Sequence, residues 1–458
     1  MRVIVIGAGV IGLATAWSLQ RAGADVTVVD PAPASGATHA AAGMLAPVAE
    51  TYYREQELGR LCLASAAAYP EFVAALARTL RREVGDVGYR ATRTLIVGAD
   101  AADSGALSDL HDLSVSLGLD SQRLTIREAR RLEPLLLPTL SCAFVAERDH
   151  QVDPRVLAQA LLEALAGAGA ELVAARVTAV CHTQTGAGGD HSPVTGVRLA
   201  DGRELHADAV VVANGVAARE VEGLGVDLSR SLRPVYGDIL RLDTPAHLRG
   251  LLTGTVRGLV AGRPVYLVPR ADGTVVLGAT SREDGSDAVS VGGVHELLRD
   301  AIRLVPAVAE FSLREAVARA RPGTPDNAPL LGRLPAPGLV AATGTFRNGV
   351  LLAPAIAGVV TRLVGLGDPT AATSGDSDTG DTGDTASFAL TDAELAAFDP
   401  TRFARPTDDS PAAPPATPPL SNPRPASVPD LATAAVPPSA RTPSPASDRH
   451  LHPIKEHR

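Results

Sequence analysis

Three glycines in a fixed pattern, Gly7, Gly9 and Gly12, follow the uncharged run 3–6 near the start of this 458-residue chain. The spacing G-x-G-x-x-G, placed between a strand and a helix, is typical of dinucleotide binding. The first glycine allows a tight turn, the second lets a pyrophosphate approach the backbone, and the third lets the helix pack closely on the strand. The phosphates would then lie at free N–H groups of the helix N-terminus.

An acidic residue, Asp30, ends the next apolar run, 26–29. A carboxylate in this place accepts a hydrogen bond from a ribose hydroxyl and repels a 2′-phosphate. The sequence therefore indicates an adenine dinucleotide other than NADP.

The elements that position these residues follow from the spacing of apolar side chains. Residues 231–320 alternate in the manner of antiparallel strands. We therefore expect an α/β fold in which a Rossmann-like βαβ domain carries an inserted, mainly antiparallel domain. The predicted helices cover 11–22, 124–136, 154–170 and 294–304, and the predicted strands lie at 3–6, 26–29, 171–180 and within 194–215.

The composition excludes several classes of function. The formal net charge of −9 argues against a nucleic-acid or anionic-membrane partner. Lysine stands only at Lys455, so a Schiff base, pyridoxal phosphate or a Walker A loop is excluded. The demanding chemistry must therefore come from a bound cofactor.

The three cysteines, Cys62, Cys142 and Cys181, are scattered and form no C-x-x-C pair. They suggest neither a disulfide framework nor a metal site, and a reducing cytoplasm is the expected compartment. We expect no leader and no membrane-spanning helix, because the first strand begins at residue 2 and no long apolar span follows.

The composition changes near Gly367, where polar and small residues replace the apolar pattern. We expect a flexible insert at 367–389 and a disordered, Pro-rich tail at 406–458. Between them, 390–405 has a cap residue and helical spacing and is predicted to form a terminal helix.

Four motifs in order give the chain a family resemblance: GAGVIGLATAWSL (7–19), HAAAGMLAP (39–47), RPGTPDNAPLLG (321–332) and FRNGVLLAPAIAG (346–358). Together they resemble the glycine oxidase family, the ThiO-type flavoenzymes of thiamine biosynthesis within the D-amino-acid oxidase group. The resemblance covers residues 1–366, with 390–405 as a further candidate.

The resemblance implies a two-domain α/β flavoprotein with noncovalently bound FAD. Its FAD-binding segments would be about 1–48, 145–220 and 318–366, and its substrate-domain segments about 49–144 and 221–317. Residues 41–44 would lie along the isoalloxazine, and the helix that begins near Gly349 would aim its N-terminus at flavin N1 and the C2 carbonyl. The residues that the resemblance places against FAD are Gly7, Gly9, Val10, Ile11, Gly12, Asp30, Ala41, Ala42, Gly43, Met44, Val177, Gly344, Asn348, Gly349, Val350 and Leu351.

Three catalytic residues would bind the substrate in such an enzyme, with Arg321 fixing its carboxylate and Tyr266 on the carboxylate side. They are Arg321 of the RPGT motif, Arg347 of the FRNG motif and Tyr266 of an earlier strand. A guanidinium offers a planar, bidentate fork for a carboxylate, so the residue type agrees with the implied role.

Hairpin geometry adds Ser281 to the expected substrate site. A two-residue turn at 272–273 predicts Ala279 opposite Tyr266 and Ser281 opposite Pro264, on one shared face. In the family this face lines the substrate pocket. Pro264 stands where a histidine, and Ser281 where a methionine, occurs in the best-known pattern, which leaves the preference for glycine open.

The implied reaction is the oxidation of glycine or a small amino acid. Hydride passes from Cα to flavin N5, O2 is reduced to H2O2, and the imine gives glyoxylate and ammonia or enters thiazole formation. The expected partners are the amino acid, O2 and further copies of the chain in a homodimer or homotetramer.

Three alternatives remain open at this stage. A sarcosine oxidase is less favoured, because no cysteine for covalent flavin attachment lies in 315–325. A D-amino-acid dehydrogenase would use another electron acceptor. An alternative of another class is a flavin-binding interaction protein without turnover that uses its Pro-rich tail to recognise a partner.

Overall fold

The computed structural model describes residues 1–183, 192–367 and 390–403. The predicted Pro-rich tail, and the predicted insert from residue 368 onward, lie outside the described residues.

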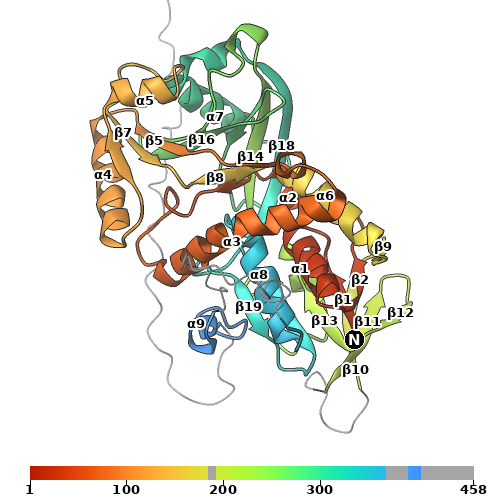
Figure 1. Cartoon of the computed structure of the whole chain (residues 1–458). Coiled ribbons are helices and arrows are strands. Elements are labelled where there is room, and N and C mark those ends of the chain that lie inside the picture. Colours follow the sequence, from red (N-terminus) through yellow and green to blue (C-terminus); the bar gives the residue numbers. More distant parts are fainter. Residues whose placement is uncertain (184–191, 368–389, 404–458) are drawn as a thin grey trace, which may run out of the picture. The chain divides into compact units, whose positions relative to one another are not determined.

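A six-stranded sheet contains the opening βαβ unit (Figure 1). β1 lies between β2 and β13, and these strands run parallel, with Ile6 opposite Val29 and Val212. The predicted strand–helix–strand unit is therefore confirmed. In spatial order the strands are β19 (Leu330–Arg333), β20 (Leu339–Thr343), β13 (Ala209–Val212), β1 (Arg2–Ile6), β2 (Asp25–Val29) and β9 (Glu171–Val173).

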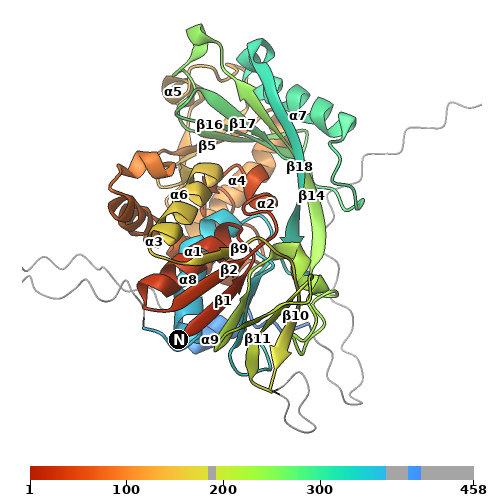
Figure 2. The same ribbon diagram turned by 90° about the vertical axis from the view of Figure 1, so that its right-hand side faces the viewer.

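Both faces of this sheet are covered, which explains the uncharged run at its centre. Val3 and Val5 pack into a core with helices α1 (Val10–Arg21), α3 (Gln56–Leu80), α6 (Pro154–Gly167) and α8 (Gly349–Leu363). Ile4 and Ile6 pack on the other face, under the small sheet of β10 (Val177–His182), β11 (Val194–Leu199) and β12 (Glu204–His206). Figure 2 shows the central sheet between these two layers. A strand buried on both faces has no reason to alternate apolar with polar residues.

Helix α3 is long and apolar enough, by length and composition alone, to cross a membrane. In the structure it packs against α8, and Tyr69 and Leu76 of its buried face belong to the main core. A core helix passes the same test of length and composition.

The second large sheet has eight strands and lies at the end of the fold away from the N-terminus (Figure 1). All neighbours in it are antiparallel except β15 and β5, which confirms the predicted antiparallel insertion. Its strands, in spatial order, are β18 (Ser312–Gly323), β14 (Arg233–Asp243), β17 (Thr274–Gly278), β16 (Arg263–Pro269), β15 (Thr255–Val260), β5 (Thr94–Gly98), β7 (Cys142–Ala146) and β6 (Gln122–Leu124). The helices that pack against it are α4 (Ala101–Ser116), α5 (Ile126–Leu132) and α7 (Val291–Leu304).

The remaining elements are short. A three-stranded sheet contains β3 (Met44–Leu45), β8 (His150–Val152) and β4 (Tyr89–Arg90). The described residues also contain two short helices, α2 (Ala37–Ala40) and α9 (Asp392–Ala396), and the 3-10 turns η1 (Val84–Val87), η3 (Gly215–Glu220), η4 (Ala246–Leu248) and η5 (Pro306–Glu310). Of the predicted helix at 390–405, the described part, 390–403, contains only the short helix α9, and the last two residues lie outside the described residues. The predicted strand at 171–180 is divided into β9 and β10.

The predicted register of the β16–β17 hairpin is wrong by one residue. Tyr266 lies opposite Gly278, not Ala279, because a three-residue turn joins the strands. Asp272 accepts hydrogen bonds from the N–H (2.9 Å) and hydroxyl (2.6 Å) of Thr274, which lengthens the turn. β17 ends at Gly278, so Ser281 does not pair with Pro264.

Candidate functional site

The glycine-rich turn after β1 has two glycines that packing alone explains. Gly7 has φ +103°, and a Cβ there would lie 2.6 Å from the Cα of Asn214. A Cβ on Gly12 would lie 1.9 Å from the carbonyl oxygen of Gly7. Gly9 is different, because its φ of −75° suits any residue and its nearest neighbour would be the Thr38 hydroxyl, at 3.4 Å. The fold does not require Gly9, whereas a group that approaches the backbone from outside does.

Asp30 ties the end of β2 to this turn. One of its oxygens accepts the N–H of Ala8 and the other accepts the N–H of Ala32, both at 2.7 Å. The hydroxyl of Thr38 accepts the first amide of α1, that of Val10, at 3.0 Å. The turn is therefore fixed in place by two side chains, Asp30 at the end of β2 and Thr38 of α2.

The small-residue stretch 41–44 lies beside the predicted substrate strand. Ala42 belongs to a buried cluster against which Met44, Tyr266 and Ala279 pack. Gly43, with φ +68°, has no room for a side chain, since a Cβ would lie 1.9 Å from the Val152 carbonyl oxygen. The structure thus brings together two motifs that are more than two hundred residues apart in the sequence.

A buried arginine, Arg270, holds the 41–44 stretch in place by hydrogen bonds. It donates to the carbonyl oxygens of Ala42 and Val152 and to the side-chain oxygen of Gln151, the last at 3.0 Å. Burial lowers the pKa of Arg270 to about 10, which still leaves it charged at neutral pH.

The N-terminus of α8 is buried and carries no side-chain cap. Asn348, at the cap position, is 4% exposed, and its Oδ1 has no hydrogen-bond partner in the described part of the chain. A Cβ on Gly349 would lie 2.7 Å from the Thr345 hydroxyl oxygen. An uncapped helix N-terminus attracts partial negative charge, and an orphaned buried acceptor needs a donor. Both features fit a polar ring system bound at this end of α8.

The first turn of α8 is also held rigidly from α3. The hydroxyl of Tyr69 donates to the Val350 carbonyl at 3.0 Å, and the hydroxyl of Ser65 donates to the Leu351 carbonyl at 2.7 Å. Gly344, before the helix, has φ +70°.

Val177 begins β10 opposite Leu199 and is buried in the core on the other face of the central sheet. Its contact with a dinucleotide, like that of Ile11, stays a prediction.

Arg321 lies on β18, with its guanidinium over Gly237 of the adjacent strand. A Cβ on Gly237 would lie 2.3 Å from Nη1, so the glycine makes room for the cation. Nη1 donates to the Thr280 carbonyl at 3.2 Å, and within the residues that the structure describes Arg321 has no carboxylate partner. Tyr266 lies next to it. Burial raises the pKa of Tyr266, and the positive charge of Arg321 opposes that rise.

Arg347, by contrast, is already paired. It donates to the Glu55 carboxylate, and its guanidinium carbon lies 4.5 Å from the centre of the Tyr52 ring. Burial lowers the pKa of Arg347, but the Glu50 and Glu55 carboxylates outweigh burial and raise it overall.

The sequence analysis did not identify the polar segment that supplies these partners. Arg257 of β15 donates to Glu50 at 2.7 Å and to the Tyr52 hydroxyl at 2.6 Å, and it lies opposite Tyr266 on the adjacent strand. The signal that could have found them is the polar run AETYYREQ (49–56) directly after the small-residue motif. We call the following five residues the site wall: Glu50, Tyr52, Glu55, Arg257 and Arg347.

A fully buried carboxylate, Asp149, anchors the start of that segment. It accepts the N–H groups of Val48 (3.2 Å) and Ala49 (2.7 Å). Burial raises the pKa of Asp149 to about 7, against the lowering effect of these two hydrogen bonds.

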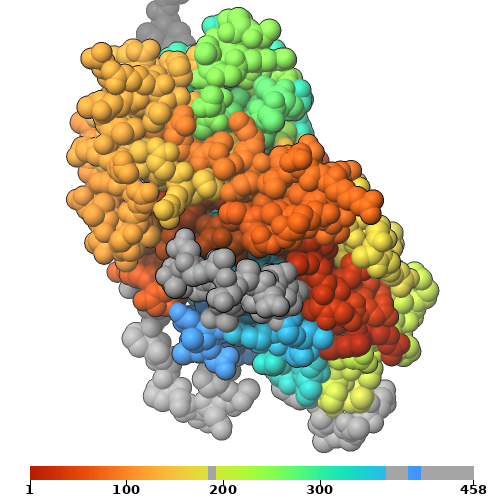
Figure 3. All heavy atoms as spheres, viewed as in Figure 1, coloured from red at the N-terminus to blue at the C-terminus, as the bar shows by residue number. Residues whose placement is uncertain are grey.

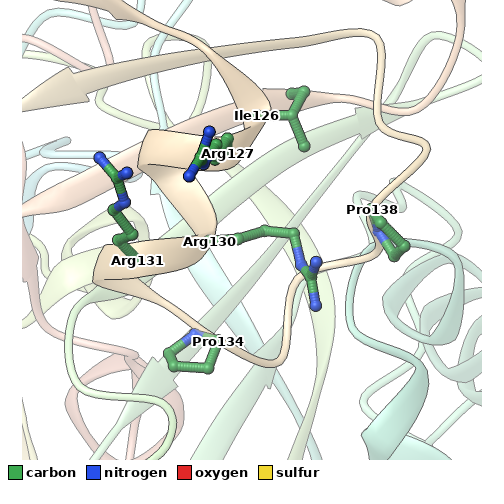
Figure 4. Close-up of a pocket in the computed structure, with 6 residues that line it drawn as sticks. All are labelled: Ile126, Arg127, Arg130, Arg131, Pro134 and Pro138. Atoms are coloured by element: carbon green, nitrogen blue, oxygen red, sulfur yellow. The ribbon is translucent and has the colours of Figure 1, made fainter.

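Two predicted positions lie away from this group. Ser281 and Pro264 are both exposed, and neither is in the cluster that contains Tyr266. A separate surface pocket over α5 (Figure 4) also contains none of the predicted site residues. It is lined by Ile126, Arg127, Arg130, Arg131, Pro134 and Pro138. No group of three potential metal ligands was found among residues 1–183, 192–367 and 390–403.

A mainly parallel sheet with a glycine turn, an uncapped helix N-terminus, and an arginine that has no carboxylate partner in the described residues together indicate a dinucleotide-dependent oxidoreductase of two-sheet architecture. The chain belongs to the FAD dependent oxidoreductase family, DAO, whose model matches residues 2–363. FAD is therefore the dinucleotide, and the uncapped α8 and the open Gly9 fit it.

The most informative relatives agree with this assignment. The chain is 34% identical to the glycine oxidase of Geobacillus kaustophilus, over 79% of this chain and 92% of that one. The crystal structure of that enzyme superposes with a TM-score of 0.71 and covers 88% of this chain and 99% of that chain, at 30% identity. The bifunctional ThiO/ThiG protein of Synechocystis is also 34% identical, over 79% of this chain and 51% of that protein. The chain thus spans about half the length of the ThiO/ThiG relatives.

Proposed function

We propose that this protein oxidises glycine or another small amino acid. The observation that carries the proposal is Arg321, a guanidinium that has no carboxylate partner in the described residues and lies beside Tyr266, which packs with Ala42 and Met44. An unpaired, partly buried cation is costly unless it meets an anion, and the carboxylate of an amino acid is such an anion. Glycine oxidases among the relatives support this substrate class.

FAD, when bound, would supply the acceptor for hydride from the substrate Cα and the route for the electrons to O2, with H2O2 as the product. The residues that would hold it, noncovalently, are the glycine turn, Asp30, the 41–44 stretch and the first turn of α8. Arg321 would bind the substrate carboxylate through two N–H groups. Tyr266 is protonated at neutral pH, since the ordinary pKa of tyrosine lies well above 7 and burial raises it further, so its hydroxyl can donate to the same carboxylate.

The site wall would close the other side of the pocket. Its two arginines are neutralised by Glu50 and Glu55, so the wall adds little net charge. Fixed orientation of the substrate would supply most of the rate enhancement, and no protein base at Cα is required for hydride loss. The imine would hydrolyse to glyoxylate and ammonia.

We also propose a place for the reaction in thiazole formation for thiamine, supported by the ThiO/ThiG relatives. We also propose the domain division that the resemblance implies: FAD-binding segments at about 1–48, 145–220 and 318–366, and substrate segments at about 49–144 and 221–317. A cytoplasmic homodimer or homotetramer is the proposed state. Ser281 stays a proposed substrate contact, without the support of the hairpin register.

The decisive experiment measures O2 consumption and H2O2 formation with glycine, sarcosine, D-alanine and D-proline. Turnover of glycine supports the proposal, and turnover of sarcosine alone would favour a sarcosine oxidase. Anaerobic bleaching of the flavin without H2O2 in air would favour a dehydrogenase. A yellow protein that no amino acid bleaches would be a flavin-binding protein without turnover. Acid precipitation should release the yellow colour into the supernatant if FAD is noncovalent.

A further inference from the structure

The turn between β18 and β19 carries a side chain where the backbone favours none. Asn327 has φ +62°, in the left-handed region that glycine adopts most easily and asparagine tolerates. Its side-chain nitrogen donates to Oε1 of Glu55 at 3.0 Å. Glycine would satisfy the backbone equally well, so the use of this side chain lies in the contact with Glu55.

Glu55 connects the turn to the site wall. Its second oxygen accepts the hydrogen bond from Arg347, and the two side chains are only 14% and 20% exposed. Arg347 directly precedes Asn348 at the cap position of α8. A displacement of Asn327 would therefore change the position of Arg347 through the Glu55 carboxylate.

The C-terminal segment also holds this turn, through Arg402. Arg402 donates through Nε and Nη2 to both carboxylate oxygens of Asp326, each at 2.9 Å. It also donates to the carbonyl oxygens of Ala328 (2.8 Å) and Pro329 (3.0 Å). Its side chain is 14% exposed. This planar, multiply bonded contact requires the guanidinium fork, which lysine lacks.

The segment has a second attachment that does not involve the turn. Phe398 is buried in the main core, and its carbonyl accepts the Leu331 N–H at 2.9 Å. Arg362 of α8 donates to the Leu390 carbonyl at 2.6 Å. Figures 1 and 3 show α9 beside α8 and β19. Docking of the segment and support of the turn can therefore be separated by mutation.

We propose that Arg402 is a positioning residue for the substrate site: through Asp326 and Asn327 it fixes Glu55, and through Glu55 it fixes Arg347. The inference rests on the proposed function only in that it takes the site wall as part of the substrate pocket. The C-terminal segment 390–403 then acts on substrate binding from outside the pocket.

The test uses the full-length, FAD-loaded protein and glycolate, a carboxylate without an amine, as the probe. Glycolate binding is measured from the change in flavin absorbance. Arg402→Ala and Asn327→Gly should each weaken it by roughly 3- to 10-fold, and Arg402→Lys should fall between Arg402→Ala and wild type. The variant that combines Arg402→Ala and Asn327→Gly should bind glycolate no more weakly than whichever single variant has the lower affinity, because both changes break the same connection. Arg362→Ala, which loosens only the other attachment, should bind as wild type does.

Wild-type affinity in Arg402→Ala, or fully additive effects in the double variant, would overturn the proposal. If Arg402→Ala does not fold, the glycolate affinities of Arg402→Lys and Asn327→Gly are compared with that of wild type instead. A second cycle, Arg402→Ala with Glu55→Gln, measures the free energy of unfolding in denaturant and needs no substrate. Non-additive effects there support the connection, and additive effects reject it, even if the wild-type protein binds no carboxylate and the proposed function fails.

Discussion

Arg347 and Glu55 form an ion pair that joins the loop before α8 to the segment before α3. Arg257 is paired in the same way with Glu50. Two cations of the substrate region thus have carboxylate partners from one short stretch of chain, whereas Arg321 has none in the described residues. This difference supports the proposal that Arg257 and Arg347 stabilise the site wall and that Arg321 binds an anionic substrate.

Gly9→Ala should separate cofactor binding from folding. A methyl group there lies 3.4 Å from the Thr38 hydroxyl at an ordinary φ, so the protein alone accommodates it. It would intrude where a pyrophosphate approaches the turn, and we expect FAD affinity to fall roughly tenfold or more. The measurement is FAD binding to the apoprotein, with unfolding temperature as the check on folding. Gly167→Ala, where a Cβ meets nothing within 4 Å, is the control; equal loss in both variants would contradict the assignment.

The buried Asp149 predicts a pH dependence of stability. Its pKa is raised to about 7 in the folded protein, from 3.8 in the unfolded chain. Between these values the folded state binds the proton more tightly, so its stabilising contribution is complete below about pH 4 and is lost as pH rises through about 7. The wild-type free energy of unfolding should therefore decrease relative to that of Asp149→Asn by about 2–4 kcal/mol between pH 5 and pH 8.

Denaturant unfolding of the FAD-loaded proteins at several pH values checks this prediction. Asp112→Asn, an exposed change on α4, should follow the wild-type pH profile. A constant difference between wild type and Asp149→Asn would show that Asp149 is ionised throughout and that its two backbone hydrogen bonds outweigh burial.

Two truncations should have opposite outcomes. Ending the chain after Arg405 removes only the Pro-rich residues 406–458, whose composition cannot support a core, and should leave FAD content and turnover within about twofold of wild type. Ending it after Leu366 also removes Phe398 and Arg402, and should lower both stability and substrate affinity. A large loss of FAD content or turnover when only residues 406–458 are removed would mean that the tail itself contacts the enzyme.

The glycine turn, the central strands and the antiparallel insertion could be predicted because local patterns determine them. A glycine at φ +103° and an uncharged strand buried on both faces leave signals within a few residues. The hairpin register could not be predicted, because the Asp272 side chain lengthens the turn by a hydrogen bond that no periodicity reveals. The site wall could not be predicted for another reason. Glu55 and Arg347 are 292 residues apart, and only the tertiary fold brings them together.

Arg321→Ala should show whether this arginine binds the substrate carboxylate. Removal of one partner of a charge-assisted pair in a water-poor site costs on the order of 2–5 kcal/mol, or roughly 30- to several-thousand-fold in kcat/KM. Arg321→Lys keeps the charge but not the planar fork, and should fall between wild type and Arg321→Ala. FAD content should not change in either variant, because no cofactor contact is assigned to this side chain. Arg314→Ala, on the same strand but half exposed and paired with Asp243, is the matched control and should keep wild-type kcat/KM. If Arg321→Ala turns over glycine normally while Arg347→Ala does not, the carboxylate anchor is Arg347, and its pairing with Glu55 must open when substrate binds.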